Sequence, residues 1–527
     1  MAIASLSPSV CTQAQQPVAA KSSEPPTFQD ALHLYRSGKL DEALAEYNAL
    51  IAAESHPAPG YVGVSRALLR LGRVAEARTA VAKALEINPE FADAHIALGE
   101  VYFRQGKLTE AEEEFVPLIK DQTDNARAYL GMARISEASS FHKQAKDLIE
   151  NAFALDPDDP EIRVERFRIL GRRSAVKLQQ VAGPAKTDDS SPAQSSKTDA
   201  EKLESLYLEA LSRDVPGCTV SPSVRSSQIA LHPLFEPANV VRGFGLDVKV
   251  EGAPARLLLD TGASGILISR KIAEKANLKK LGESTIVGIG DKNPMEGYHS
   301  VAGSIRIGDL EFKNCIVEVS DKTSVVGDDG LIGADVFANS LVDIDFPNQK
   351  LRLSELPPYP NERVKPSSLD SAAQPDLQLH DRYVAPEMKS YTPVYQFHRQ
   401  LVVQTRVNKS AAKLFLLDTG AGINAISPAA AKEVTSVSEN PGMEIKGLSG
   451  KVKNVFSGDS VTMTFGNIQQ DILGIIAFDT TAISDSMGTE VSGILGFSAL
   501  KFLDIKIDYR DGLVKFTFDA NRFRETP

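Results

Sequence analysis

The sequence has no tryptophan, only three cysteines among its 527 residues, and no long uninterrupted apolar stretch. A helix needs about 20 consecutive apolar residues to cross a bilayer, so we expect no membrane span. Cys11, Cys218 and Cys315 are odd in number and lie far apart, which argues against both a disulfide framework and a CxxC metal site. We therefore expect packing alone to stabilise the fold.

Basic residues are also scarce relative to acidic ones. The formal net charge is -11 and the isoelectric point is near 5.4, which excludes nucleic acid as the main partner because its binders need a basic face. No HExxH pair, GxSxG elbow, P-loop or three-glycine dinucleotide motif occurs. We expect neither a metal nor a cofactor.

The N-terminal segment, residues 1–25, contains no charged residue before Lys21 and is moderately apolar. Small residues near its end are typical of a signal peptide, but a basic start is missing. Two interpretations stay open: the remnant of a signal for a secreted or periplasmic protein, and a disordered tail.

The next segment, residues 26–160, is an internal repeat. SGKLDEA, LGRVAEA and QGKLTEA share a glycine at their second position, and Gly38, Gly72 and Gly106 are 34 residues apart. Ser140 takes the fourth such position, which indicates about four units. The period and pattern resemble tetratricopeptide repeats, pairs of helices that stack into a solenoid. The resemblance implies a protein partner in the groove of the array.

Residues 161–235 change composition along their length. A basic amphipathic stretch at 162–177 predicts a capping helix, residues 183–200 are typical of a flexible linker, and 200–213 predict a connecting helix. Short alternating apolar runs then predict β-strands to the end of the chain.

This β-rich part is duplicated. GLIGADVF at 330–337 recurs as GILGFSAL at 493–500, which predicts one half at 236–355 and a second at 392–520. A proline-containing connector, 356–391, joins them. We therefore expect a multidomain protein in which an α-helical solenoid precedes an all-β double domain with pseudo-two-fold symmetry.

Each half contains the tripeptide Asp-Thr-Gly after an apolar run, beginning at Asp260 and at Asp418, which lies 158 residues later. At average amino-acid usage a given tripeptide occurs about 0.1 times in a chain of this length. A carboxylate at the end of a buried strand is costly unless its charge is used or compensated. The two aspartates are therefore candidate catalytic residues.

Over residues 239–518 the sequence resembles the aspartic protease family, as a fused pair of retropepsin-like domains. The second family motif, two hydrophobic residues and a glycine, is matched in both halves by Leu331, Ile332, Gly333, Ile494, Leu495 and Gly496. The resemblance implies a peptide or protein substrate and an endopeptidase in which Asp260 and Asp418 share a proton and activate water. Thr261, Gly262, Thr419 and Gly420 would support the catalytic loops.

Two further features follow from the resemblance. Glycines after each catalytic strand, Gly288, Gly290, Gly447 and Gly450, are candidates for substrate-covering flaps or for ordinary hairpin turns. Pepsin-like enzymes have Ser or Thr where this chain has Ala263 and Ala421, so we expect a mildly acidic optimum, about pH 5–6.

Alternative functions remain at this stage. The β-rich part could be a vestigial protease fold that only binds peptides, with the repeats acting as an interaction scaffold. Each half could instead pair with its twin in another chain. Fusion of the halves favours a monomer with an intramolecular pair, because tethering raises the effective concentration of one half near the other.

Overall fold

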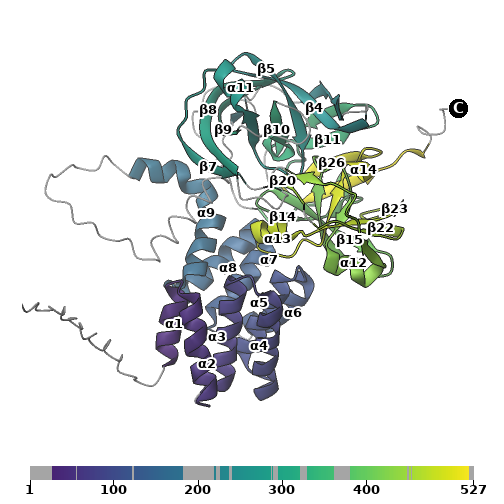
Figure 1. Ribbon diagram of the computed structural model, residues 1–527. Helices are drawn as coiled ribbons and strands as arrows, with labels where there is room; N and C mark the ends of the chain where they lie inside the picture. The colour runs from purple at the N-terminus through teal and green to yellow at the C-terminus, as the bar shows by residue number, and fades with distance from the viewer. Residues whose placement is uncertain are drawn as a thin grey trace, which may run out of the picture.

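The computed structural model describes residues 27–54, 56–120, 124–181, 219–220, 226–236, 240–286, 288, 295–320, 329–360, 380–447, 450–452 and 454–520. Figure 1 shows a helical N-terminal part followed by an all-β part, which confirms the predicted fold class. The predicted tail at 1–25 and the predicted helix at 200–213 lie outside the described residues.

The array consists of paired helices followed by one longer helix. Its helices are α1 (Phe28–Arg36), α2 (Leu40–Ala52), α3 (Pro57–Arg70), α4 (Val74–Ile87), α5 (Ala92–Arg104), α6 (Leu108–Lys120), α7 (Ala126–Ala138), α8 (His142–Leu155) and α9 (Pro160–Val181). Three pairs turn at Gly38, Gly72 and Gly106, with φ of 81°, 73° and 69°. Ser140 adopts the same left-handed conformation in the fourth turn, with φ of 61°. The spacing of 34 residues therefore marks a shared backbone geometry even where glycine is replaced.

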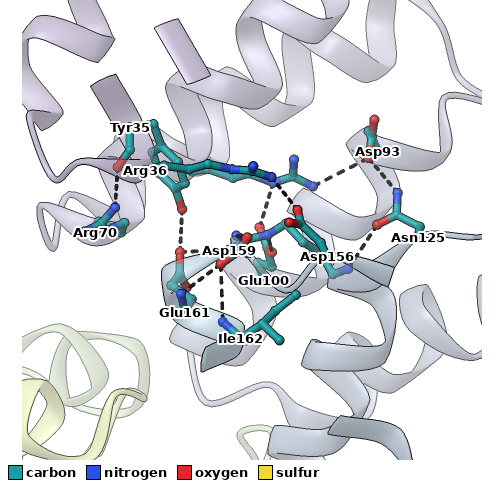
Figure 2. A network of polar contacts seen from close by, with 12 residues as sticks. Tyr35, Arg36, Arg70, Asp93, Glu100, Asn125, Asp156, Asp159, Glu161 and Ile162 are labelled. Atoms are coloured by element: carbon teal, nitrogen blue, oxygen red, sulfur yellow. Dashed lines mark hydrogen bonds and ion pairs between the residues drawn. The ribbon is translucent and has the colours of Figure 1, made fainter. Parts of the chain in front are cut away.

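Charged side chains of the odd-numbered helices pair with one another across the array (Figure 2). Arg127 on α7 binds Glu100 on α5 at 2.6 Å and Glu161 on α9 at 3.1 Å. Tyr35 on α1 also donates a hydrogen bond to Glu161. Burial acts to raise the pKa of Glu161, but Arg127 and Arg134 hold it well below its usual range. The network thus links the first helix to the start of the last one.

The first β half is built on a nine-stranded sheet. Its strands are β1 (Thr219–Val220), β3 (His232–Glu236), β4 (Val240–Val250), β5 (Ala253–Asp260), β6 (Ile266–Ser269), β7 (Gly282–Ile286), β8 (Met295–Ile307), β9 (Leu310–Ser320) and β10 (Gly330–Gly333). Helix α11 (Arg270–Lys275) and the 3-10 turn η1 (Ala334–Phe337) lie between strands. Strand β10 runs parallel to β5 and pairs Gly333 with Asp260.

The second half repeats this arrangement on a ten-stranded sheet. Its strands are β14 (Tyr395–Phe397), β15 (Gln400–Val407), β16 (Lys413–Asp418), β17 (Ala425–Ile426), β18 (Val437–Glu439), β21 (Phe456–Gly458), β22 (Val461–Phe465), β23 (Ile468–Ile472), β24 (Ile476–Ala477) and β25 (Gly493–Gly496). Helices α12 (Pro428–Val434), α13 (Thr481–Met487) and α14 (Phe497–Leu500) and the hairpin β19 (Lys446–Gly447) and β20 (Gly450–Lys451) complete it. Strand β25 runs parallel to β16 and pairs Gly496 with Asp418, as in the first half.

A six-stranded sheet joins the two halves. Its order is β13 (Thr392–Pro393), β27 (Leu513–Thr517), β26 (Asp504–Asp508), β11 (Leu341–Asp345), β12 (Lys350–Ser354) and β2 (Ser226–Ala230). Strands β11 and β26 come from different halves and are antiparallel neighbours. The rings of Phe244 and Phe346 in the first half contact Phe497 in the second at 5.7 and 5.6 Å between centroids. The halves therefore share one sheet and one apolar core within a single chain.

The array packs against the second half through an apolar cluster that we call the docking cluster. It contains Leu108, Ala138, Phe397, Val402, Leu414, Leu416, Met487 and Val491, with Phe103, Tyr395 and Ile483 beside it. Two backbone links accompany it: Glu490 N donates to Arg104 O at 2.9 Å, and Thr489 Oγ1 donates to Phe103 O at 2.6 Å. Figure 1 shows this contact where α5 and α7 approach α13 and β14.

Two sequence-based expectations need correction. The β part begins before residue 236, because β2 pairs with β12 and β3 pairs with β4; the β2 segment SSQIA is too short and polar to stand out. Cys315 is disulfide-bonded, so packing alone does not stabilise the fold. Strand β1 pairs with β9, the strand that carries Cys315, and the spacing of the cysteines does not reveal this pairing. Cys11 and Cys218 lie outside the described residues.

Candidate active site

The two candidate aspartates end the parallel strand pairs of the two halves. Asp260 is the last residue of β5 and Asp418 the last of β16, and each follows a run of buried leucine or phenylalanine. A buried strand fixes the position of its last side chain, and the glycine two residues later permits the chain to turn sharply. The duplicated strands thus bring both carboxyl groups to the interface of the halves.

The threonines of the two loops hydrogen-bond across that interface. Thr261 N donates to Thr419 Oγ1 and Thr419 N donates to Thr261 Oγ1, each at 3.0 Å. Each hydroxyl in turn donates to the opposite strand, Thr261 to Leu417 O at 2.7 Å and Thr419 to Leu259 O at 2.9 Å. Both threonines are 1 % exposed, so these four bonds lie in an apolar environment where an unmade bond is costly.

The carboxyl groups lie over the opposite glycines. A Cβ on Gly262 would overlap the carboxyl group of Asp418, and one on Gly420 would overlap that of Asp260. The two carboxyl groups hydrogen-bond to each other. Gly262 N also donates to Asp260 at 2.8 Å, and Gly420 N and Ala421 N donate to Asp418 at 2.9 and 2.7 Å. Only glycine at these two positions leaves room for the pair.

Burial and proximity both change how this pair ionises. Burial raises the pKa of Asp260 well above its usual value, and the nearby Asp418 carboxylate raises it further. Burial also raises the pKa of Asp418. Two carboxyl groups in contact cannot both ionise readily, so the pair retains one proton over a wide pH range. Such a pair holds a base and an acid side by side.

The residues of the second motif lie in the strands that flank β5 and β16. Leu331, Ile332 and Gly333 form β10 with Gly330, and Ile494, Leu495 and Gly496 form β25 with Gly493. A Cβ on Gly496 would overlap the backbone of Ile423, which explains the need for glycine after the two apolar residues.

The candidate flap glycines lie at two hairpins. Gly288 lies in the connection between β7 and β8, while Gly290 lies outside the described residues. Gly447 pairs with Gly450 in the β19–β20 hairpin. The bases of both hairpins pack near the catalytic loops: Ile286 and Met295 cluster with Ala263, and Ile445 and Val452 cluster with Ala421. This position is compatible with a cover over the aspartates.

The structure adds polar residues that the sequence analysis missed. Gln400, at the start of β15, donates to Gly262 O, and Ser264 Oγ donates to His398 O at 3.1 Å. In the other half, a Cβ on Gly422 would lie 2.9 Å from Arg242 Nη1. Gln400 and Arg242 each precede a candidate aspartate by 18 residues, so the duplication itself was a signal that could have found them.

Asp335 and Ser498 occupy equivalent positions, two residues after each motif glycine. Asp335 is 4 % exposed, accepts a hydrogen bond from Gly265 N at 3.0 Å and lies 3.6 Å from Arg399. Ser498 accepts a hydrogen bond from Asn424 N at 3.1 Å. The first Asp-Thr-Gly loop is therefore held by a charged pair and the second by a neutral contact.

Known protein families match both parts of the chain. An aspartyl protease match covers residues 246–336, and tetratricopeptide repeat matches cover residues 28–84 and 68–135. Part of the first β half is thus similar to aspartyl proteases, and the helical array before it is similar to tetratricopeptide repeats, as the sequence predicted.

Individual proteins are similar over shorter parts. Cellulose synthase operon protein C of Pseudomonas fluorescens is 31 % identical over 150 residues, 28 % of this chain and 10 % of that protein. DnaJ homolog subfamily C member 3 of Bos taurus is 25 % identical over 122 residues, 23 % of this chain and 24 % of that protein. The chain thus spans a quarter or less of each. The crystal structure of aspartic proteinase from Irpex lacteus is similar with a TM-score of 0.32 and 11 % identity, covering 56 % of this chain and 98 % of that one.

Across the part of the chain that the structure describes, no helix has the length and apolarity to cross a membrane.

Proposed function

We propose that the chain is an aspartic endopeptidase whose dyad is Asp260 and Asp418. The observation that supports the proposal is the contact between two buried carboxyl groups, one from each half, that hydrogen-bond to each other. Backbone N–H groups of both loops fix the two groups in place. The aspartyl protease match to residues 246–336 agrees with this chemistry.

In the proposed reaction a water molecule is the nucleophile. The ionised carboxylate takes a proton from water as the water oxygen attacks the carbonyl carbon of the peptide. At the same time the protonated carboxyl donates its proton to the carbonyl oxygen. The resulting diol then collapses and the C–N bond breaks. The amine leaves with a proton from the protonated carboxyl, while the other carboxylate takes a proton from a hydroxyl of the diol, which restores the singly protonated dyad. Because the pair titrates as a unit, neither role is assigned to one aspartate.

The deciding experiment compares the full chain with its Asp260→Asn and Asp418→Asn variants on a peptide library at several pH values. Each variant should lose activity by a factor on the order of 10³ or more, because the two residues act together. Asp309→Asn, at an exposed aspartate in the β8–β9 turn, is the matched control and should be unaffected. Undiminished cleavage by either dyad variant, with circular dichroism unchanged, would rule the mechanism out.

We propose that the array recruits protein substrates to this site. Tetratricopeptide repeats present extended surfaces to partners. Arg127 pairs with Glu100 and with Glu161, so these three side chains are already occupied by contacts within the array. If the dyad proves inactive, a non-catalytic interaction scaffold is the alternative function.

We also propose that the protein works in an oxidising compartment. The bonded state of Cys315 supports this location, because disulfides persist mainly outside the reducing cytosol.

A further inference from the structure

One hairpin of the second half contacts both the helical array and the catalytic loop of the first half. Strands β14 and β15 pair Phe397 with Gln400 and leave a two-residue turn, His398 and Arg399. Both turn residues have positive φ, 48° and 69°. Non-glycine residues adopt this conformation at an energetic cost, so surrounding contacts must hold the turn.

The tip of the hairpin holds the first catalytic loop at three points. Gln400 donates to Gly262 O, His398 O accepts from Ser264, and Arg399 pairs with Asp335. Asp335 in turn accepts the hydrogen bond from Gly265 N. Gly262 is the residue whose N–H donates to Asp260, so the hairpin restrains the same peptide segment that positions a catalytic carboxyl.

The base of the hairpin belongs to the docking cluster. Phe397, which precedes the turn, meets Phe103 of α5 edge to face, with ring centroids 6.4 Å apart. Val402, on β15, is buried in the same cluster. Two turn residues thus separate Phe397, packed on the array, from Gln400, bound to the catalytic loop.

Among the residues that the structure describes, the first half shows no equivalent of this link. Its β3–β4 hairpin carries Arg242 at the position of Gln400, but no described residue of that hairpin belongs to the cluster that packs on the array. The array packs directly on β16, the strand that leads to Asp418, whereas it reaches the first Asp-Thr-Gly loop through the β14–β15 hairpin.

We propose that the β14–β15 hairpin is a positioning element for the first catalytic loop, that Arg399 and Gln400 are its positioning residues, and that Phe103 of the array fixes its place. The proposal rests on the proposed peptidase activity of Asp260 and Asp418. A loosened hairpin leaves the substrate-binding surface in place but lets the loop leave its productive geometry. Small misplacements of catalytic groups lower the rate of the chemical step more than they weaken binding.

The test measures kcat and KM of the full chain for a peptide substrate. Arg399→Gln, Gln400→Ala and Phe103→Ala should each lower kcat on the order of tenfold, with KM within about twofold. Arg399→Lys should recover most of the loss, since it retains the charge that pairs with Asp335. The controls are Arg406→Gln, at an exposed arginine on β15, and Phe91→Ala, at the opposite end of α5 from Phe103.

Unchanged kcat in Arg399→Gln would overturn the proposal, as would a rise in KM alone. An equal loss in Phe91→Ala would overturn the part assigned to the array. Should Phe103→Ala fail to fold, Thr489→Val removes only the hydrogen bond to Phe103 O and should give a smaller loss of the same kind.

A second readout separates this proposal from the proposed function. Amide hydrogen exchange in residues 261–265 should be faster in Arg399→Gln and Phe103→Ala than in the wild type. Hydrogen exchange can be measured in a protein without activity. If the wild type cleaves no peptide, the proposed peptidase function is rejected, and the exchange rates still decide whether the hairpin positions the loop. Unchanged exchange in both variants would overturn that role.

Discussion

Ala263 and Ala421 directly follow the catalytic loops and contact the bases of the two hairpins near the dyad. Neither alanine can donate a side-chain hydrogen bond to a carboxylate. We expect the double variant Ala263→Ser, Ala421→Ser to move the acid limb of the kcat/KM profile to lower pH by about one unit, because a hydroxyl donor favours the ionised form of the dyad. The measurement is the pH dependence of peptide cleavage; an unmoved or raised limb would contradict this account.

Substitution of Thr261 measures how much the hydrogen bonds between the two loops stabilise the fold. In Thr261→Val, Leu417 O and Thr419 N lose their partners in a buried environment. Each buried group left unsatisfied costs about 1–3 kcal/mol, so we expect the free energy of unfolding to fall by about 2–4 kcal/mol in urea titrations. Thr79→Val, at an exposed position on α4, is the control and should change it by less than about 0.5 kcal/mol.

At the scale of elements, the pairing of β11 with β26 places two carboxyl groups opposite each other. Asp345 faces Asp504, and Asp343 lies next to them opposite Lys506. Burial and the nearby Asp343 carboxylate raise the pKa of Asp504 to about 7. The contact between the two halves therefore holds a proton that the unfolded chain releases near pH 4.

The sign of the resulting pH dependence follows from that difference. Because the folded state binds the proton more tightly, stability should fall as pH rises from about 4 and level off above about 7. In Asp504→Asn the loss of stability that comes from this carboxyl group should disappear. The melting temperatures of wild type and variant at pH 4.5, 6 and 8 measure this difference. If the melting temperatures of the two proteins change equally with pH, Asp504 does not cause the pH dependence.

The sequence predicted much of the elements and of the site because both depend on local patterns. The 34-residue period located the helical turns, including Ser140, and the duplicated Asp-Thr-Gly located the paired loops. The sequence could not predict the pairing of Asp335 with Arg399, because these residues belong to different halves and meet only when the halves pack together. It also missed β2 and the bonded state of Cys315, both of which depend on strands distant in sequence.

At the scale of the molecule, the docking cluster joins the array to the second half. Leu414 and Leu416 of β16 face the array, while Arg256 and Leu258 occupy the equivalent positions of β5. The flexible linker predicted from the sequence would suggest that the array is separable from the β part, but this contact argues against that. Without the array, the second half would expose a contiguous apolar surface. Such surfaces promote association between molecules.

A chain that begins at residue 219 should therefore self-associate or precipitate, although it retains both catalytic loops. Adding Leu414→Arg, which copies the first half, should restore part of the solubility. Light scattering of the two shortened chains measures the difference. A shortened chain that is monodisperse without the substitution would show that the docking cluster contributes little.

The network of Figure 2 bears on how the array unfolds. In most repeat proteins each unit contacts only its neighbours, so the stability of the array is a sum of terms for single repeats and for adjacent pairs. Here Tyr35 and Arg36 at the end of α1 contact Glu161 and Asp156 at the start of α9 and in the preceding turn, more than a hundred residues away. Opening the first repeat therefore also breaks contacts of the last. We therefore expect cooperativity: the array should unfold as a single unit and not repeat by repeat.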